Sequence, residues 1–352
     1  ELADGISEIA DLPDSFSARL RISGKCLLDL VLNFAYIFEV SEAETIAMGY
    51  TPENKDDFIE TVQIEAPTQS APIVCIMDSG VQEEHKYLAP SISSDESISL
   101  LPNNTSTSDE VAGGGHGTRV AGAVLYPKAV PLDGVYQLPC WIRNMRILDE
   151  NNCLPENVYP PKAIAIAVQK YNVENQIPTK IFNHSIGSHR PCEMKHMTPW
   201  AAEIDSQSYN HDVLFIQAAG NISTDVISAY WQAGYLYPEY FDRELCRISN
   251  PAQSLQAITV GSVSADELET DDFIALGKHM EVSSFSRSGP GIWDVLKPEV
   301  VEYGGTHVYN KGSVPPQLTT PPEVCPELIR KSPEGPAFAR DDVGTSFSAP
   351  KV

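Results

Sequence analysis

The chain has 352 residues, of which 48 are acidic and 24 are basic, giving a formal net charge of −24 at pH 7. That sign argues against nucleic acid and anionic membranes as partners, and a solvated acidic surface is its simplest interpretation. Apolar residues make up 42% of the chain, which predicts a sizeable core, yet no run approaches the roughly 20 apolar residues of a membrane helix.

The first 70 residues predict a small N-terminal unit followed by a linker. Residues 17–23 alternate like a strand, residues 24–34 place apolar side chains on one helical face, and residues 35–40 again resemble a strand. This β-α-β segment predicts a small α/β domain over residues 1–45, which is either a permanent accessory domain or a propeptide-like one. The polar, proline-containing stretch 46–70 is predicted to be a linker.

From residue 71 to residue 352, short apolar runs alternate with helix-like segments. Runs such as IVCIM at 73–77 and VLFIQAA at 213–219 are apolar on both faces. Strands that are covered on both faces are typical of a parallel sheet between two layers of helices. The sequence therefore predicts an α/β fold with a mostly parallel central sheet and helices on both of its faces.

The cysteines indicate the redox environment. There are seven of them, an odd number, and no two have a C-x-x-C spacing. This pattern suggests neither a disulfide framework nor a zinc site. The acidic N-terminus also lacks the basic and apolar regions of a signal peptide. We therefore expect a reduced, cytoplasmic protein, with a secreted protein as the alternative.

Three short stretches carry the residue types of nucleophilic catalysis. Asp78 ends a predicted buried strand in MDSGV, His116 begins a predicted helix in GGGHGTRVAG, and Ser346 begins another in VGTSFSAP. A serine hydroxyl is a weak nucleophile that needs a base within hydrogen-bond reach, and histidine accepts a proton near neutral pH. A buried aspartate orients the imidazole and stabilises the imidazolium that forms. The three residues therefore predict a catalytic triad.

A fourth residue supports this triad. Asn221 ends the apolar run FIQAAGN, where its amide could donate a hydrogen bond to an oxyanion together with the backbone N–H of Ser346. Taken singly, an aspartate or asparagine in a turn, a buried histidine or a serine helix cap would be ordinary. Their chain order, and their places at strand ends and helix starts, favour the catalytic interpretation.

These motifs resemble those of the subtilase family of serine peptidases over roughly residues 72–352. DSG, HGT and GTSFSAP resemble the aspartate, histidine and serine motifs of the family, and AAGN resembles its oxyanion motif. The resemblance implies a subtilisin-like fold and a serine endopeptidase that cleaves polypeptides through an acyl-enzyme. NHSIG resembles the substrate-strand motif, and the small residues of AAG suit a pocket wall. The implied substrate-binding residues are Ser185, Ile186, Gly187, Ala218, Ala219 and Gly220.

The chain departs from the family pattern in three places. Arg119 stands where the family usually has a second histidine, a change from which we expect no consequence. Phe347 stands where methionine is common, which is a change in packing. The chain stops at Val352, six residues after Ser346, whereas the resemblance implies that further structure follows.

The resemblance also bears on cofactors and partners. A structural calcium ion is possible in this family, but the chain has no dense D-x-D-x-D loop, and the acidic stretch 93–110 is more simply a solvated insertion. We therefore assign no metal ligand and expect no cofactor. Some bacterial subtilases with a similar N-terminal segment are found beside an ATPase gene, which implies an ATPase or another protein as a partner.

Two rival functions remain open from the sequence. The same triad permits an esterase or an acyl-transfer enzyme, although a strand-like substrate segment favours an extended peptide. A non-catalytic peptide-binding module would keep the pocket without the chemistry, and the intact triad argues against it.

Overall fold

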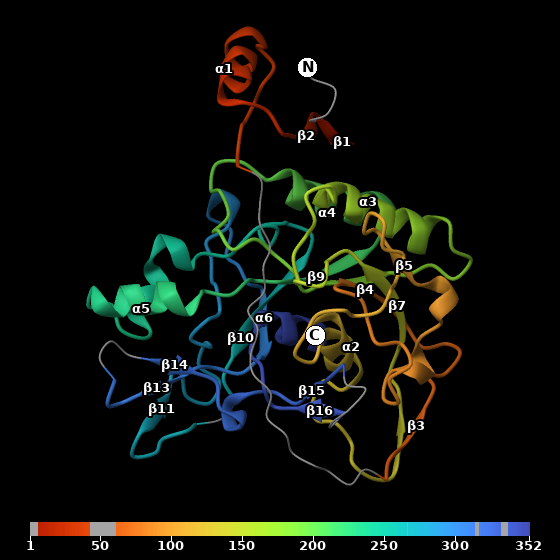
Figure 1. Cartoon of the computed structure of the whole chain (residues 1–352), viewed down its shortest axis with the longest axis vertical. Helices are drawn as coiled ribbons and strands as arrows, with labels where there is room; N and C mark the ends of the chain where they lie inside the picture. The colour runs from red at the N-terminus through yellow and green to blue at the C-terminus, as the bar shows by residue number, and fades with distance from the viewer. Residues whose placement is uncertain (1–5, 43–60, 266, 314–316, 332–336) are drawn as a thin grey trace.

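The computed structural model describes residues 6–42, 61–265, 267–313, 317–331 and 337–352. Its centre is a seven-stranded sheet in the order β12-β10-β9-β8-β4-β7-β5, and every neighbouring pair is parallel. The predicted parallel α/β fold is confirmed (Figure 1). The strands are β4 (Ile73–Asp78), β5 (Ile98–Ser99), β7 (Trp141–Arg146), β8 (Ile181–His184), β9 (Leu214–Ala218), β10 (Ile258–Val263) and β12 (Val300–Tyr303).

Strand β4 shows why the sheet needs cover on both faces. Cys75 and Met77 point into a core shared with α3 (Pro160–Val168) and α4 (Pro199–His211). Val74 and Ile76 point to the opposite face, into a core shared with α2 (Gly117–Leu125) and with Phe347 of α6 (Thr345–Ser348). Because side chains alternate along a strand, an uninterrupted apolar run buries both faces, as the sequence predicts.

Local signals set several helix boundaries. Pro160 begins α3 and Pro199 begins α4, at positions where the N–H that proline lacks has no partner within the helix. Ser223 caps α5 (Thr224–Gln232) through a hydrogen bond from the Val226 N–H. A turn of π-helix (Gln169–Val173) extends α3. Single 3-10 turns lie at Ala89–Ser91, Ser94–Glu96, Glu239–Asp242, Glu244–Cys246, Ile292–Asp294, Pro322–Val324 and Ala349–Lys351.

The N-terminal segment differs from the predicted β-α-β order. The helix is present as α1 (Gly24–Asn33), but residues 34–42 form no strand. The pairing strand lies earlier: β1 (Ile6–Asp11) is antiparallel to β2 (Phe16–Leu20). A turn closed by a hydrogen bond from the Leu12 N–H to the Ser15 carbonyl joins these strands. Such a short Pro-Asp turn makes the hairpin a more local pairing than a crossover through the helix.

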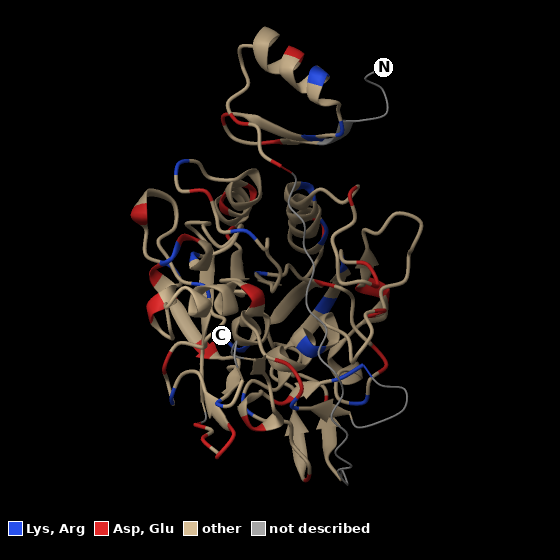
Figure 2. Cartoon of the chain, turned by 60° about the vertical axis from the view of Figure 1, so that its left-hand side comes forward, with Lys and Arg blue, Asp and Glu red and all other residues tan. Residues whose placement is uncertain are grey.

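Polar contacts link this N-terminal unit to the loop that leads into α3 (Figures 1 and 2). The Ser17 hydroxyl bonds to the Tyr159 hydroxyl, and the Arg19 guanidinium donates to the Glu156 carbonyl at 2.7 Å. Helix α1 has no buried residue. Exposed ion pairs contribute little, about 0–1 kcal/mol each, whereas Ala10 of β1 is buried and the Phe38 ring lies 4.6 Å from the His196 ring. The predicted domain boundaries stay predictions.

Part of the predicted linker belongs to the main body. Strand β3 (Gln63–Glu65) pairs in parallel with β6 (Val135–Gln137), so residues 63–65 form an edge of that body. Residues 46–60 of the predicted linker lie outside the described residues. Shorter antiparallel pairs complete the strands: β11 (Phe273–Ala275), β13 (Val308–Asn310) and β14 (Leu318–Thr319) form one sheet, and β15 (Leu328–Ile329) and β16 (Phe338–Ala339) another. Among the described residues, no helix is long and apolar enough to cross a membrane.

Candidate active site

Asp78 and His116 meet at the carboxyl end of the sheet. Asp78 is the last residue of β4, and His116 is the residue that precedes α2. The His116 Nδ1 and Asp78 Oδ1 atoms are 2.6 Å apart, and both side chains are almost fully buried. Gly117 permits this approach, because a Cβ atom there would lie 2.1 Å from the Gly80 carbonyl oxygen.

Burial and charge act on His116 in opposite directions. Burial lowers its pKa, but the charge and hydrogen bond of Asp78, together with the charges of Asp342 and Asp109, outweigh burial and leave the pKa raised above its usual value. A carboxylate beside an imidazole favours the imidazolium. The site therefore stabilises the protonated histidine that general-base catalysis would produce.

Ser346 lies in the first turn of α6 and is 3% exposed. Its hydroxyl donates a hydrogen bond to the Ser185 carbonyl at 2.8 Å, and the buried His116 Nε2 has no hydrogen-bond partner among the described residues. The next residue, Phe347, packs its ring 5.7 Å from the His116 ring. The structure thus brings α6 against His116 and forms the Asp–His bond, while the Ser–His bond is not made. Such bonds often tighten only when substrate binds.

Asn221 lies just beyond β9 and faces the start of α6. Its Oδ1 atom accepts hydrogen bonds from the Thr345 N–H at 3.0 Å and from the Thr345 hydroxyl at 2.9 Å. These two bonds fix the orientation of the amide, and its Nδ2 atom lies on the side of Gly344. The donor group of Asn221 is therefore held beside the residues that lead into Ser346.

The two predicted substrate-binding segments follow neighbouring parallel strands, β8 and β9. Ile186 and Ala219 are buried in separate core clusters, so their side chains serve packing. Gly187, Gly220 and Asn221 are the partly exposed positions. The main-chain groups of Gly220 are bonded to Thr345 and Arg287, so we expect a ligand to contact main chain mainly at Gly187.

The buried side chain of Gln217, which sequence reasoning missed, forms a hydrogen-bond clamp between the two segments. The Gln217 Nε2 group donates to the Ile186 carbonyl and to the Ala218 carbonyl, at 2.9 Å each. Its Oε1 atom lies 2.6 Å from His184 Nδ1. Burial lowers the pKa of His184 to about 4 despite the Gln217 hydrogen bond, so His184 is neutral at pH 7. The only signal in the sequence was a glutamine inside an apolar strand.

Ser249 lies between the same two segments. A Cβ atom on Gly187 would lie 3.0 Å from the Ser249 Oγ, and one on Gly220 would lie 2.2 Å from it. The Ser249 hydroxyl donates to the Ala219 carbonyl at 3.3 Å. Glycine at both positions therefore leaves room for this serine, which packs directly behind them.

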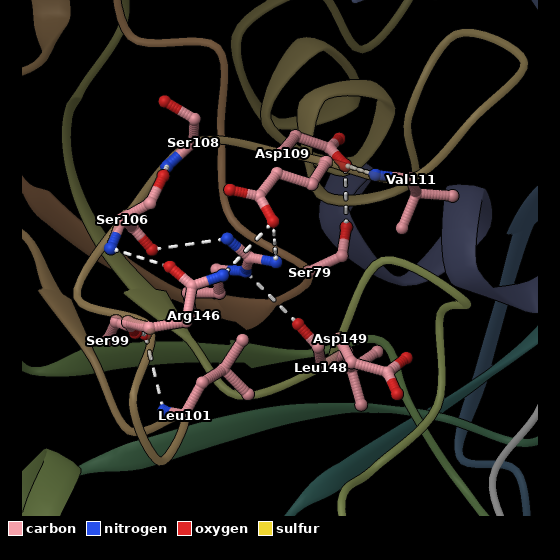
Figure 3. A network of polar contacts seen from close by, with 12 residues as sticks. Ser79, Ser99, Leu101, Ser106, Ser108, Asp109, Val111, Arg146, Leu148 and Asp149 are labelled. Carbon is pink, nitrogen blue, oxygen red and sulfur yellow. Dashed lines mark hydrogen bonds and ion pairs between the residues drawn. The ribbon is translucent and has the colours of Figure 1, made fainter.

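Asp109 holds the Asp78 and His116 elements together. Its carboxylate accepts hydrogen bonds from the Ser79 hydroxyl at 3.1 Å, the Val111 N–H at 3.2 Å and the Thr118 N–H at 2.9 Å. The Ser79 hydroxyl in turn accepts from the Gly117 N–H at 2.9 Å. Figure 3 shows the hydrogen bonds from Ser79 and Val111 to Asp109. This residue was part of the acidic stretch that the sequence analysis treated as solvated.

Carboxylates of the acidic stretch 93–110 also pair with arginines of β7. Glu110 bonds to Arg146 at 2.9 Å, and Glu96 bonds to Arg143 at 3.1 Å. The Arg146 hydrogen bond and charge lower the pKa of Glu110 to about 2. The interpretation of the stretch as a solvated insertion is therefore wrong at the buried Asp109, whereas Glu96 and Glu110 anchor the stretch to the body while staying partly exposed. In the part of the chain that the structure describes, no group of three or more His, Cys, Asp or Glu side chains is arranged to hold a metal ion.

Solved structures with the same fold include two peptidases. The epidermin leader peptide processing serine protease of Staphylococcus aureus, in a serine-to-alanine mutant, superposes with a TM-score of 0.55 at 16% identity and covers 98% of this chain and 81% of its own. A lanthipeptide protease superposes with a TM-score of 0.50 at 18% identity and covers 80% of this chain and 70% of its own.

Sequence comparison extends the likeness beyond the fold. The uncharacterized protein y4bN of Sinorhizobium fredii is 31% identical over 157 residues, which is 43% of this chain and only 36% of that protein's length. The model of the subtilase family, Peptidase S8, matches residues 69–352, which include Asp78, His116, Asn221 and Ser346. This chain therefore belongs to the subtilase family of serine peptidases.

Proposed function

We propose that this chain is a serine endopeptidase in which Asp78, His116 and Ser346 form the catalytic triad. The observation that carries the proposal is the buried 2.6 Å contact between His116 Nδ1 and Asp78 Oδ1, with His116 Nε2 left without a partner among the described residues. That nitrogen is the atom that would accept a proton from the serine hydroxyl.

The reaction then proceeds in two halves. The Ser346 oxygen attacks the carbonyl carbon of the scissile peptide bond, and its proton passes to His116 Nε2. The resulting oxyanion is held by the Ser346 N–H and the Asn221 amide. The C–N bond breaks as His116 returns the proton to the leaving amine, which leaves an acyl ester on Ser346.

Water completes the second half. His116 takes a proton from a water molecule, whose oxygen attacks the ester carbonyl carbon. The ester C–O bond breaks, and the Ser346 oxygen regains its proton from His116. Asp78 stays ionised throughout and stabilises the imidazolium in each half. This scheme requires no metal or cofactor step.

The arrangement favours a polypeptide over a small ester. The Gly220 N–H and carbonyl are already bonded, to the Thr345 hydroxyl and the Arg287 N–H, but residues 185–187 extend strand β8 and Gly187 is their partly exposed position. An extended peptide that is laid along such main chain gains hydrogen bonds with little demand on its sequence. Esters of small acids gain little from these contacts, so the preference is measurable as the ratio of kcat/KM for peptide and ester substrates with the same acyl group.

The test is the hydrolysis of an unfolded protein and of a fluorogenic peptide by the wild-type chain and by Ser346→Ala. We expect the wild type to cleave internal peptide bonds and the variant to lose turnover while its circular dichroism stays unchanged. Turnover by pure Ser346→Ala would refute the triad. A folded wild type without activity on either substrate would favour the peptide-binding module instead.

A protein partner that controls access, such as an ATPase, is a further part of the proposal. The N-terminal unit has large apolar side chains that are more than half exposed, including Leu28, Leu32, Tyr36 and Phe38. Surfaces of this kind suit contact with another protein. We expect the isolated chain to cleave unfolded proteins slowly, and rapid cleavage of many unfolded proteins without a partner would contradict control of this kind.

A further inference from the structure

Arg119 is the centre of a buried ion-pair network beside the triad. It lies on α2, three residues after His116, and is 4% exposed. Its Nη1 atom donates to Asp342 Oδ2 at 2.9 Å, and its Nη2 atom donates to Asp341 Oδ2 at 2.8 Å and to the Gly113 carbonyl at 2.8 Å. One guanidinium thus joins three segments: the helix of His116, the glycine loop before it and the segment before Ser346.

A second set of contacts ties the same loop to the chain that precedes the serine segment. The Lys331 N–H donates to the Gly114 carbonyl at 2.6 Å, and the Lys331 Nζ group donates to the Val111 carbonyl at 2.9 Å. The Arg330 Nε lies 3.4 Å from Asp341 Oδ2. Asp341 is therefore shared between two buried guanidinium groups.

The path from this network to each catalytic side chain is short. On one side, His116 precedes the first turn of the helix that holds Arg119. On the other side, Asp342 is followed by Gly344, whose N–H donates to the Gly304 carbonyl, and by Thr345, whose N–H donates to Asn221. The chain between Asp342 and Ser346 is therefore fixed at both ends, so a shift of Asp342 would also move Ser346.

We propose that Arg119 is a positioning residue that sets the distance between Ser346 and His116 by pairing with Asp341 and Asp342. This inference rests on the proposed peptidase function and assigns a role to a residue that departs from the family pattern. Planar guanidinium groups bind two carboxylates with defined geometry. Buried ion pairs are weak evidence for stability, so the role expected here is alignment.

The charges that face His116 come from every element around it. They are Asp78 at the end of β4, Asp109 in the loop before α2, Asp342 ahead of α6, and Arg119 on α2, with Arg330 beside Asp341 and Lys331 beside the Val111 carbonyl. Asp342 is among the charges that raise the pKa of His116. Asp342→Asn should therefore lower that pKa and move the acid limb of the kcat/KM profile to lower pH.

The alignment itself is tested with Arg119→Lys and with the triple variant Arg119→Met, Asp341→Asn, Asp342→Asn, which removes the Arg119 ion pairs together with the contact between Arg330 and Asp341. The matched control is Arg143→Met with Glu96→Gln, which removes a buried arginine of β7 and its partly exposed carboxylate partner, away from His116. For each protein we measure the melting temperature, kcat, KM and the rate of labelling by a fluorophosphonate.

We expect kcat and the labelling rate of the triple variant to fall about 10- to 100-fold, the loss typical of a reacting group misplaced by about an ångström, with KM changed less than about threefold. For Arg119→Lys, which keeps the positive charge but not the planar guanidinium, kcat and the labelling rate should lie between the values of the wild type and the triple variant. This variant decides the question if the triple variant does not fold. The control should lose stability while kcat stays at the wild-type value.

Two results would overturn the inference: rates per folded molecule that equal those of the control, or a loss confined to the melting temperature. Labelling of the wild-type chain separates this test from that of the proposed function. If the wild type is not labelled at Ser346, the peptidase proposal fails. If the wild type is labelled and the Arg119 variants react at the same rate, only the positioning role fails.

Discussion

Gln217 offers a test of how the substrate-binding segments are held. Gln217→Leu removes three buried hydrogen bonds at once: those to the Ile186 and Ala218 carbonyls at 2.9 Å, and the one to His184 at 2.6 Å. Each buried polar group left unpaired costs about 1–3 kcal/mol. Because the three groups share one side chain, we expect a total loss of about 3–6 kcal/mol in the free energy of unfolding.

The assay is urea unfolding followed by circular dichroism, in a Ser346→Ala background so that self-cleavage does not contribute. The matched control is Gln232→Leu at an exposed position of α5, which should change the free energy of unfolding by less than about 0.5 kcal/mol. In the active background, Gln217→Leu should also raise KM for peptides, because the carbonyls of the two segments are no longer tied together.

A second variant separates lost hydrogen bonds from changed packing. Adding His184→Phe keeps an aromatic ring against Trp200, whose ring centroid lies 5.3 Å from that of His184, and removes one of the unpaired groups. The double variant should therefore lose less stability than the sum of the two single changes. A Gln217→Leu protein within about 1 kcal/mol of the wild type would refute this account of the clamp.

Three further expectations follow from the site and the chain. Asn221→Leu should lower kcat about 10²- to 10³-fold with little change in KM, and a KM effect at unchanged kcat would make Asn221 a ground-state contact. All seven cysteines are free in the structure, so alkylation of the denatured, unreduced protein should modify every one, and two or more disulfides would count against a reduced protein. Residues 1–70 should remain attached during prolonged incubation; their Ser346-dependent loss with a rise in activity would identify a propeptide.

Much of the fold was predictable because its signals are local. The run 73–77 buries alternate side chains on opposite faces of the sheet, so its apolar pattern predicted a covered parallel strand directly. The N-terminal hairpin was missed because residues 35–40 also have a strand-like pattern, which favours them as the partner of residues 17–23. The observed partner of β2 is β1. Pairing partners are decided by tertiary contacts that periodicity does not contain.

The triad residues were predictable from short motifs, whereas the residues that support them were not. Asp78, His116 and Ser346 are each flanked by glycine within a few residues, and that chemistry is readable in short motifs. The residues that support the triad are not marked by such motifs. Arg119 and Asp342 are 223 positions apart, and Gln217 bonds to Ile186 from 31 positions away. No local pattern marks such partners, so a buried polar residue in an apolar element is the only hint that sequence provides.

The most direct test of the central claim is to identify the residue that a fluorophosphonate modifies. The wild-type chain is incubated with the reagent, its intact mass is measured, and the labelled peptide is sequenced by mass spectrometry. A triad activates one serine above all others, so we predict one adduct per chain, on Ser346, that is lost in His116→Ala although the serine is still present. Absence of an adduct on the folded wild type, or an adduct on Ser346 that persists in His116→Ala, would contradict the account.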